Sequence, residues 1–463
     1  MSNDEIVHSK KNIASYGFGR FLAQFLSFAF NAYVLFYYES ELGLASWLVG
    51  LGFIIFAVWN AINDPILGYF VDRPFKFTKK RGRRFPWIMI GGILWIFSYV
   101  LIFTPPSVDP QEGALILFGW LVFATCLYDT CFSLFSINLW GLFPDKFTSS
   151  EERRTAGGLT GVIGTAGVFF GAMVPPMFIK FGDPQSYIIQ AGVMILISVI
   201  ILVLAIPGCR DDQIRVDRYL KKWEEGMERE SFLKTFKMLI KHKNFVAYQI
   251  VMVFYLAAVT SMIASVPYLT RYILKMEAGA ITLLMLGYLI GTFIGIPVIT
   301  KVANKVDDNT KVMAVTGVLL AISIFPFYFL VDYMTLFVVF IFMGICVGAY
   351  WALLTMPLLS DVIDEGAVIM GKRSEGIYQG AGLFIQRAAW VVATVAIVGI
   401  HILTGFVEGA ETQSAEAVWG IQVHFGLLPA IFALISALAV WKLIKLSPEK
   451  IQSTQAKLKE LGL

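Results

Sequence analysis

Long apolar runs dominate the sequence, and short polar segments separate them. A helix needs about 20 mainly apolar residues to cross the hydrocarbon core of a membrane. Twelve runs meet this requirement, beginning near residues 15, 47, 86, 114, 156, 187, 244, 278, 310, 333, 376 and 420. The pattern therefore predicts an all-α membrane protein with twelve transmembrane helices.

The longest polar segment divides these helices into six and six. It covers residues 208–243 and separates a predicted N-terminal bundle at 1–207 from a C-terminal bundle at 244–446, followed by a tail at 447–463. Two pseudo-symmetric six-helix bundles are a common plan of secondary transporters and indicate an internal duplication.

The polar segments near the chain ends and in the middle also have predicted structures. Residues 1–12 are polar, and the first apolar run lacks the short core and cleavage site of a signal peptide, so we expect it to be a retained helix. Residues 213–243 and 448–463 mix apolar and basic positions at helical spacing. That mixture is typical of helices that lie on a membrane surface.

The composition agrees with a bilayer environment. Of the 463 residues, 57% are hydrophobic and 15% are charged, and the mean hydropathy is +0.71. Soluble domains carry about 25% charged residues. So few charges could not cover a water-facing surface, which excludes a water-soluble enzyme. The net charge of +4 is too small to indicate nucleic-acid binding.

The sequence also lacks the common patterns of catalytic and metal chemistry. Cys126, Cys131 and Cys346 fall within apolar runs and Cys209 lies at the edge of one, which leaves no disulfide framework or CxxC metal site. The HExxH, P-loop and nucleophile-elbow patterns are absent. We therefore expect no enzyme activity, no cofactor, no metal site and no direct use of ATP.

The distribution of lysine and arginine predicts the orientation in the membrane. The loop after the second run carries seven of them between residues 73 and 84, whereas residues 39–46 and 105–112 contain none. Basic loops stay on the cytoplasmic side. We expect an integral protein of the plasma (cell inner) membrane with both termini and the central segment in the cytoplasm.

Five ionisable residues stand out within the predicted spans: Arg20, Asp64, Asp129, Arg271 and Arg387. Each costs at least ~2.5 kcal/mol at the membrane centre. Asp129 and Arg387 lie near the middle of their runs and form either a structural ion pair or a substrate or proton site. We favour the second reading because intramembrane charges mark transport pathways, and we expect Asp129, Asp64 or both to neutralise Arg387. Arg271 is close enough to a span end to reach the interface.

The second run contains a group of oxygen-bearing side chains. Asn60 and Asp64 are four residues apart and share a helix face, while Pro65 has no N–H to donate to the carbonyl of Ala61. A carboxylate, an amide and a loose carbonyl are the hard ligands that a small cation prefers. The alternative is a proline kink capped by Asp64.

Motifs in both halves of the chain resemble a known family. The segments at 16–19 (YGFG), 63–68 (NDPILG) with Asp72 and Arg73, and 82–88 (GRRFPWI) match in the first half. In the second half, 361–365 (DVIDE) and 373–376 (RSEG) are followed by Arg387. Together they resemble the glycoside-pentoside-hexuronide cation symporters of the major facilitator superfamily, the melibiose permease group.

This resemblance implies roles for three charged residues. Asp64 matches the second of the two family carboxylates that bind sodium, lithium or protons in the second span. Asp129 matches an aspartate that contacts the sugar and lies near the cation, and Arg387 matches a lysine in the eleventh span. Asn63 is the neighbour of Asp64 within the matching motif. The resemblance therefore predicts the major facilitator fold and coupled transport.

The chain also departs from the family pattern at five positions. Asn60 replaces the first carboxylate of the second span, and Gln24 stands where the family has a sugar-binding aspartate. Cys126 replaces a threonine of the cation site, and Ser133 replaces a sugar-stacking tryptophan. The arginine of the fifth span aligns near Gly161. These departures concern the ligands of both sugar and cation, so they leave the substrate open.

We expect a secondary active transporter that moves a small solute, most simply a sugar or glycoside, by alternating access. A proton is favoured over sodium as the coupling cation, because Asn60 removes a carboxylate and Cys126 offers a soft thiol in place of a hydroxyl. The alternatives are a sodium-coupled or uncoupled carrier of another substrate such as a lysolipid, and a non-transporting membrane sensor. Plant-type sucrose carriers share the GRRxP pattern, so their substrate class also stays open.

The candidate site residues fall into two groups. Trp351 and Trp390 join the substrate group because their rings could stack on a ligand, although such residues are more often core or interface aromatics. The expected substrate-binding residues are Arg20, Gln24, Asp129, Ser133, Arg387, Trp351 and Trp390, and the expected cation-coupling residues are Asn60, Asn63, Asp64 and Asp129.

Overall fold

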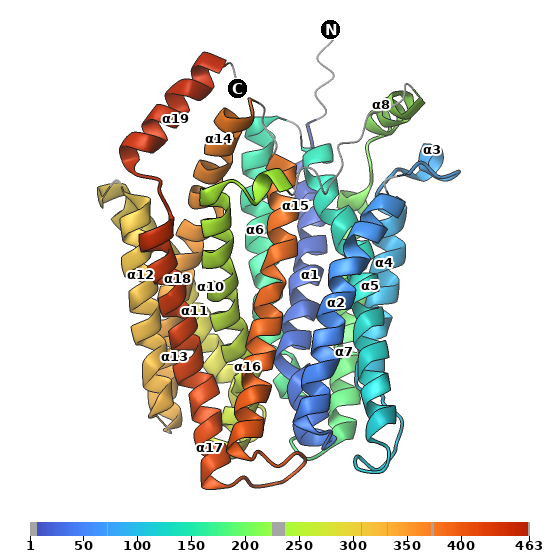
Figure 1. Ribbon diagram of the computed structural model, residues 1–463. Coiled ribbons are helices and arrows are strands. Elements are labelled where there is room, and N and C mark those ends of the chain that lie inside the picture. Colours follow the sequence, from blue (N-terminus) through green and yellow to red (C-terminus); the bar gives the residue numbers. More distant parts are fainter. Residues whose placement is uncertain are drawn as a thin grey trace. The chain divides into compact units, whose positions relative to one another are not determined.

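The computed structural model describes residues 7–71, 73–147, 149–224, 237–306, 308–330, 332–371 and 375–461. Within these ranges every regular element is a helix (Figure 1). Twelve of the described helices are long and apolar enough to cross a membrane. The prediction of an all-α protein with twelve transmembrane helices is therefore confirmed.

The chain forms two compact units. The first comprises Met1–Glu228, Glu277–Thr282 and Glu408–Ala410, and the second comprises Arg229–Met276, Leu283–Val407 and Glu411–Leu463. Part of the predicted central segment, residues 225–236, lies outside the described residues, as do Asp72, Arg373 and Ser374 of the motifs that indicated the family.

The first unit contains the first six spanning helices and two short helices. They are α1 (Lys10–Phe36) with the π-helical turn η1 (Tyr37–Glu41), α2 (Ser46–Val71), α3 (Thr78–Arg81), α4 (Phe85–Ile102), α5 (Ala114–Lys146), α6 (Ser150–Met173) with the 3-10 turn η2 (Pro175–Met177), α7 (Pro184–Cys209) and α8 (Gln213–Glu224). Helix α8 covers the first part of the predicted surface segment.

The second unit contains the remaining spanning helices. They are α10 (Lys243–Tyr268) with η3 (Leu269–Ile273), most of α11 (Ala280–Val306), α12 (Asn309–Ile324) with η4 (Phe325–Tyr328), α13 (Tyr333–Leu353) with η5 (Leu354–Leu358), α14 (Leu359–Met370), α15 (Glu375–Gln386), α16 (Ala388–Thr404), α17 (Ala415–Gln422) with η6 (Val423–Leu427), α18 (Leu428–Leu443) and α19 (Pro448–Leu461). The eleventh span is interrupted between α15 and α16, which the apolar pattern did not predict.

Local sequence explains many of the helix boundaries. A serine or aspartate N-cap accepts a hydrogen bond from the first turn of six helices: Ser9 of α1, Ser149 of α6, Asp183 of α7, Asp308 of α12, Asp332 of α13 and Ser414 of α17. Gly405 ends α16 in the left-handed region, with φ 66°, a conformation that glycine adopts without steric cost.

Glycine sets the close packing of α6 against α1. A Cβ atom on Gly167 would lie 2.3 Å from the carbonyl oxygen of Phe21, and one on Gly171 would lie 2.5 Å from that of Phe25. Only hydrogen therefore fits at these two positions, as is common where membrane helices approach closely. Gly161, two turns earlier on α6, has open space beside it.

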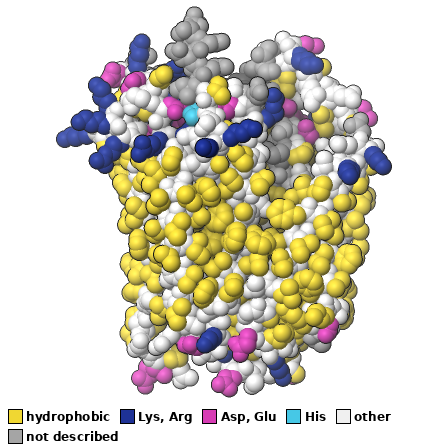
Figure 2. Space-filling view, turned by 180° about the vertical axis from the view of Figure 1, so that it is seen from behind, with side chains coloured by type: hydrophobic (Ala, Val, Ile, Leu, Met, Phe, Trp, Pro, Cys, Tyr) yellow, Lys and Arg dark blue, Asp and Glu magenta, His cyan; other side chains and the backbone are white. Residues whose placement is uncertain are grey.

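The outer surfaces of the spanning helices are apolar. Large hydrophobic side chains such as Ile62 (53% exposed) and Leu403 (87%) point outward. On the face drawn in Figure 2, hydrophobic side chains form a broad band, and most of the lysine and arginine side chains gather at one end of it. A hydrophobic band of this kind suits a bilayer rather than water.

Candidate functional site

Helices α2 and α5 bring five of the predicted site residues together in the first unit. Asn60, Asn63 and Asp64 share one face of α2, since they are three and four residues apart. Asp129 and Ser133 are likewise one turn apart on α5. These five residues are called the α2–α5 polar cluster below.

The carboxylate of Asp129 is the centre of this cluster. The side-chain amides of Asn60 and Asn63 both donate to it, Asn60 in a very short contact with Oδ1 and Asn63 to Oδ2 at 3.4 Å. Only 3% of Asp129, 8% of Asn60 and 6% of Asn63 is exposed. Because a buried carboxylate is costly without donors, the two amides account for its place inside a spanning helix.

Asp64 is bound from the opposite helix. The hydroxyl of Ser133 donates to Oδ1 of Asp64 at 2.5 Å. Asn60 and Asp64 thus share a face of α2, as the sequence predicts, but contact different residues of α5. The cluster therefore holds two carboxylates, each with hydrogen-bond donors from the facing helix.

Helix α2 continues through Pro65. The proline ring has no N–H, so the carbonyl oxygen of Ala61 loses its usual helical donor. This oxygen belongs to the same turn as Asn60 and Asp64, which agrees with the expectation of a loosened carbonyl there.

Aromatic rings and a second hydrogen-bonded pair surround the cluster. The ring of Tyr128 stacks on that of Phe30 of α1, with centroids 4.6 Å apart. The ring centroid of Trp95 of α4 lies 5.7 Å from that of Tyr128. Trp59 donates its indole N–H to Thr130 at 3.0 Å. None of these residues was predicted from the sequence, although Trp59 is next to Asn60, and Tyr128 and Thr130 are next to Asp129.

The two candidates on α1 lie on one helix face. Arg20 donates to the hydroxyl of Thr160 on α6 at 3.3 Å. The side chain of Gln24, one turn later, is exposed. Their contribution to a substrate site stays a prediction.

The other three candidates belong to the second unit. Arg387 is the N-cap of α16 at the interruption of the eleventh span, and its carbonyl accepts from the backbone N–H of Trp390 at 3.2 Å. Trp351 is 41% exposed and stacks on Tyr255 with centroids 5.8 Å apart. The expected pairing of Arg387 with Asp129 or Asp64 joins residues of different units and stays a prediction.

The chemistry of the α2–α5 polar cluster suits a small cation. It offers two carboxylates, a hydroxyl and two amides, which are oxygen-bearing groups that bind protons or hard cations. In the part of the chain that the structure describes, there is no group of three or more His, Cys, Asp or Glu side chains that could hold a metal ion.

Comparison with known families agrees with this architecture. The family model described as MFS/sugar transport protein matches residues 15–447. The chain belongs to this family. The resemblance inferred from the motifs is thereby confirmed, and it agrees with the twelve spanning helices of the structure.

Individual relatives of this MFS family protein match over most of their length. An uncharacterized symporter, YjmB of Bacillus subtilis (strain 168), is 27% identical over 96% of this chain and 94% of its own. The isoprimeverose transporter of Lactiplantibacillus pentosus is 22% identical over 93% and 88%. The sodium-dependent lysophosphatidylcholine symporter 1-B of Danio rerio is 23% identical over 87% and 80%. All three are symporters or transporters by name.

Proposed function

We propose that this protein is a symporter that moves a sugar or glycoside across the membrane together with a cation, by alternating access. The observation that supports this most directly is the α2–α5 polar cluster. Two carboxylates inside spanning helices cost free energy, and such residues mostly mark the pathways of substrates and ions. The family description and the isoprimeverose transporter support a sugar substrate.

The coupling cation in this proposal is a proton, bound by Asp64 or Asp129. The amides of Asn60 and Asn63 direct their N–H groups at Asp129, so one lone pair on each oxygen of Asp129 is already engaged and fewer are left for a sodium ion. Ser133 can donate to an ionised Asp64 and accept from a protonated one. The hydroxyl therefore allows Asp64 to gain and lose a proton without losing its partner.

The substrate in this proposal is bound by the remaining candidates. Arg20 and Gln24 of the first unit, and Trp351, Trp390 and Arg387 of the second, offer hydrogen bonds, stacking surfaces and charge. Arg387 is the counter-charge of Asp129 or Asp64 in one conformation, and substrate binding changes that pairing. One proton moving inward is worth ~2.3 kcal/mol per 100 mV, which supports a concentration ratio of about fifty.

Uptake into proteoliposomes tests the coupling. Wild-type protein, Asp64→Asn, Asp129→Asn and the control Asp332→Asn, an exposed N-cap of α13, are compared under an imposed pH gradient and then under a sodium gradient at constant pH. The pH gradient should drive accumulation by the wild type and the control, and neither cluster variant should accumulate substrate. Stimulation by sodium alone would refute the proton assignment, and indifference to both gradients would indicate uniport.

A thermal-shift screen of the purified protein tests the substrate class. A true ligand stabilises the folded state by mass action, so a sugar or glycoside should raise the melting temperature. The relative from Danio rerio makes a lysolipid the second candidate. Stabilisation by lysophosphatidylcholine but by none of the sugars, glycosides or uronates would favour that alternative. If the proteoliposomes of the coupling assay took up neither class of compound, a non-transporting sensor would be favoured.

We also propose that both termini face the cytoplasm of a cell whose inner membrane holds the protein. The basic residues of the loop at 73–84 support this orientation. Exposed lysines and arginines gather at one end of the hydrophobic band in Figure 2, as expected of the side that faces the cytoplasm.

A further inference from the structure

Each unit places a histidine directly before its first spanning helix, and each histidine contacts a glutamate. His8 precedes α1 and contacts Glu152 of α6, the first residue of the fifth span, directly after the connection from the fourth span. His242 is the N-cap of α10 and contacts Glu365, which lies between the fourth and fifth spans of the second. The two contacts are therefore copies of one arrangement, called the His–Glu pair below.

A third charged residue completes each copy from the segment after the sixth span of its unit. In the first unit it is Asp212, which lies between α7 and α8 and contacts His8. In the second unit it is Lys450 of α19, which pairs with Glu365. The two copies thus share their positions in the fold but differ in the sign of this third charge.

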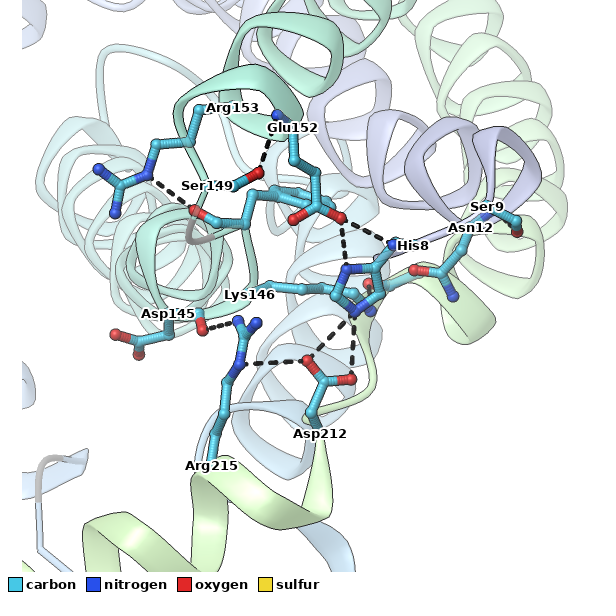
Figure 3. A network of polar contacts seen from close by, with 12 residues as sticks. His8, Ser9, Asn12, Asp145, Lys146, Ser149, Glu152, Arg153, Asp212 and Arg215 are labelled. Atoms are coloured by element: carbon cyan, nitrogen blue, oxygen red, sulfur yellow. Dashed lines mark hydrogen bonds and ion pairs between the residues drawn. The ribbon is translucent and has the colours of Figure 1, made fainter. Parts of the chain in front are cut away.

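In the first copy, both ring nitrogens of His8 face carboxylates (Figure 3). Nδ1 lies 2.7 Å from Oε1 of Glu152, and Nε2 lies 3.2 Å from both oxygens of Asp212. The backbone N–H of His8 also donates to Glu152 at 2.8 Å. Only 7% of the His8 side chain and 6% of the Glu152 side chain is exposed.

In the second copy, the ring of His242 has one carboxylate and one hydroxyl as partners. Nε2 lies 2.9 Å from Glu365, and Nδ1 lies 2.9 Å from the hydroxyl of Tyr378. Asn244 donates to the same carboxylate at 2.5 Å, and Lys450 supplies the positive charge.

The two copies differ in the number of N–H protons that their histidine rings need for these contacts. A neutral imidazole has a single N–H, and an ionised carboxylate can only accept. His8 can therefore donate to Glu152 and Asp212 at once only as the doubly protonated cation. His242 needs no such charge, because Tyr378 can donate to one nitrogen while the other nitrogen donates to Glu365.

The charges around His8 come from every element packed against it. Besides Glu152, they are Lys146 and Asp145 of α5, Arg153 of α6, Asp212 of the segment before α8, and Arg215 of α8. Arg215 lies 3.6 Å from Asp212, Lys146 donates to the carbonyls of Gly208 and Arg210, and Arg153 donates to the carbonyl of Phe147. Glu152 and Asp212 are thus the two groups bonded to the ring.

The carboxyl of Asp212 responds to the ring beside it. Burial works to raise its pKa, but the hydrogen bond from His8 and the nearby positive charges outweigh burial, and the pKa of Asp212 is lowered from its ordinary value. Asp212 therefore stays ionised near neutral pH and cannot supply the missing proton itself.

We propose that the His8 copy is a proton-sensitive lock and that the His242 copy is its insensitive counterpart. The protonated ring ties the starts of α1 and α6 to the segment before α8, and loss of the proton releases one of the two carboxylates. Histidine changes charge near neutral pH. The lock therefore couples the pH at this end of the first unit to the freedom of its helices, whichever ion is co-transported.

Thermal unfolding of the purified full-length protein at several pH values tests this inference. The variants are His8→Gln, which is always neutral, His8→Arg, which is always charged, and the matched control His242→Gln. At about pH 5.5 the wild type should melt about 2–4 °C above His8→Gln, and by about pH 8.5 this difference should vanish. The effect of His242→Gln on the melting temperature should not grow as the pH falls, because the contacts of His242 need no second proton on the ring.

The variant His8→Arg separates a lock from a simple contact. Its difference from His8→Gln should be the same at both pH values, because arginine keeps its charge. The inference is overturned if the wild type exceeds His8→Gln equally at both pH values, or if the effect of His242→Gln also grows at the lower pH.

Discussion

Replacing Glu365 by glutamine should destabilise the second unit by an amount that depends on pH. Glu365 lies on α14 and joins it to His242 and Asn244 at the start of α10 and to Lys450 of α19. Burial works to raise its pKa, but hydrogen bonds from these three partners outweigh burial and lower the pKa of Glu365 to about 2. Glutamine keeps the size of the side chain and removes its charge.

The magnitude follows from this pKa. At about 1.4 kcal/mol for each pH unit, lowering the pKa from 4.5 to about 2 stabilises the folded state by ~3 kcal/mol. The side chain is 12% exposed, and solvent screening reduces the figure to about 2 kcal/mol. The melting temperature should therefore fall by about 4–8 °C at pH 7.

The pH dependence has a definite sign. Because the pKa is lower in the folded state, the stabilisation is complete above the unfolded value of 4.5 and disappears as the pH falls through about 2. The difference between wild type and Glu365→Gln should stay constant from about pH 8 to 5 and fall to less than half near pH 3. Thermal unfolding followed by intrinsic fluorescence measures it.

A matched control removes the general effect of losing a carboxylate. Glu460→Gln changes an exposed residue of α19 and should leave the melting temperature unchanged within about 1 °C. Equal melting temperatures for wild type and Glu365→Gln at pH 7, or a difference that persists undiminished at pH 3, would refute the electrostatic reasoning.

Three further predictions address topology, packing and transport. Single cysteines at Asp109 and Arg218, both exposed, should react with an impermeant maleimide from opposite sides of the membrane, and labelling from one side would contradict the twelve-span topology. Gly167→Val should lower stability by about 2 kcal/mol or more because the side chain meets the backbone of α1, whereas Gly161→Val, in open space, should cost less than half as much in the same melting assay. Arg387→Ala should abolish uptake in proteoliposomes while the protein still folds, and wild-type uptake would exclude a role for this charge.

The spanning helices could be predicted from the sequence because hydrophobicity over about 20 residues is a local property. The interruption of the eleventh span could not be predicted, because no glycine or proline lies beside Arg387. Without such a residue, an interruption depends on how the helix packs against its neighbours. The π-helical turns, such as η1 and η3, could not be predicted either, because they too depend on packing. Helix boundaries at Ser9 and Asp183 follow ordinary capping preferences.

The candidate site was partly predictable. Helical spacing and the family motifs pointed to Asn60, Asp64 and Asp129 as members of a site, but only the structure shows that Asn60 contacts Asp129 while Asp64 contacts Ser133. Those pairings depend on the register of α2 against α5, which no single helix encodes. His8 lies outside every apolar run, and its role appears only when segments far apart in sequence meet.

The junction between α15 and α16 changes the local winding of the eleventh span at Arg387. This residue keeps helical dihedral angles, with φ −61° and ψ −26°, and its carbonyl oxygen accepts from the backbone N–H of Trp390, three residues later, at 3.2 Å. A bond from residue i to residue i+3 winds the chain more tightly than the i to i+4 bonds of an α-helix. The charged side chain therefore leaves the span at the residue where its winding changes, so its direction depends on one tightened turn.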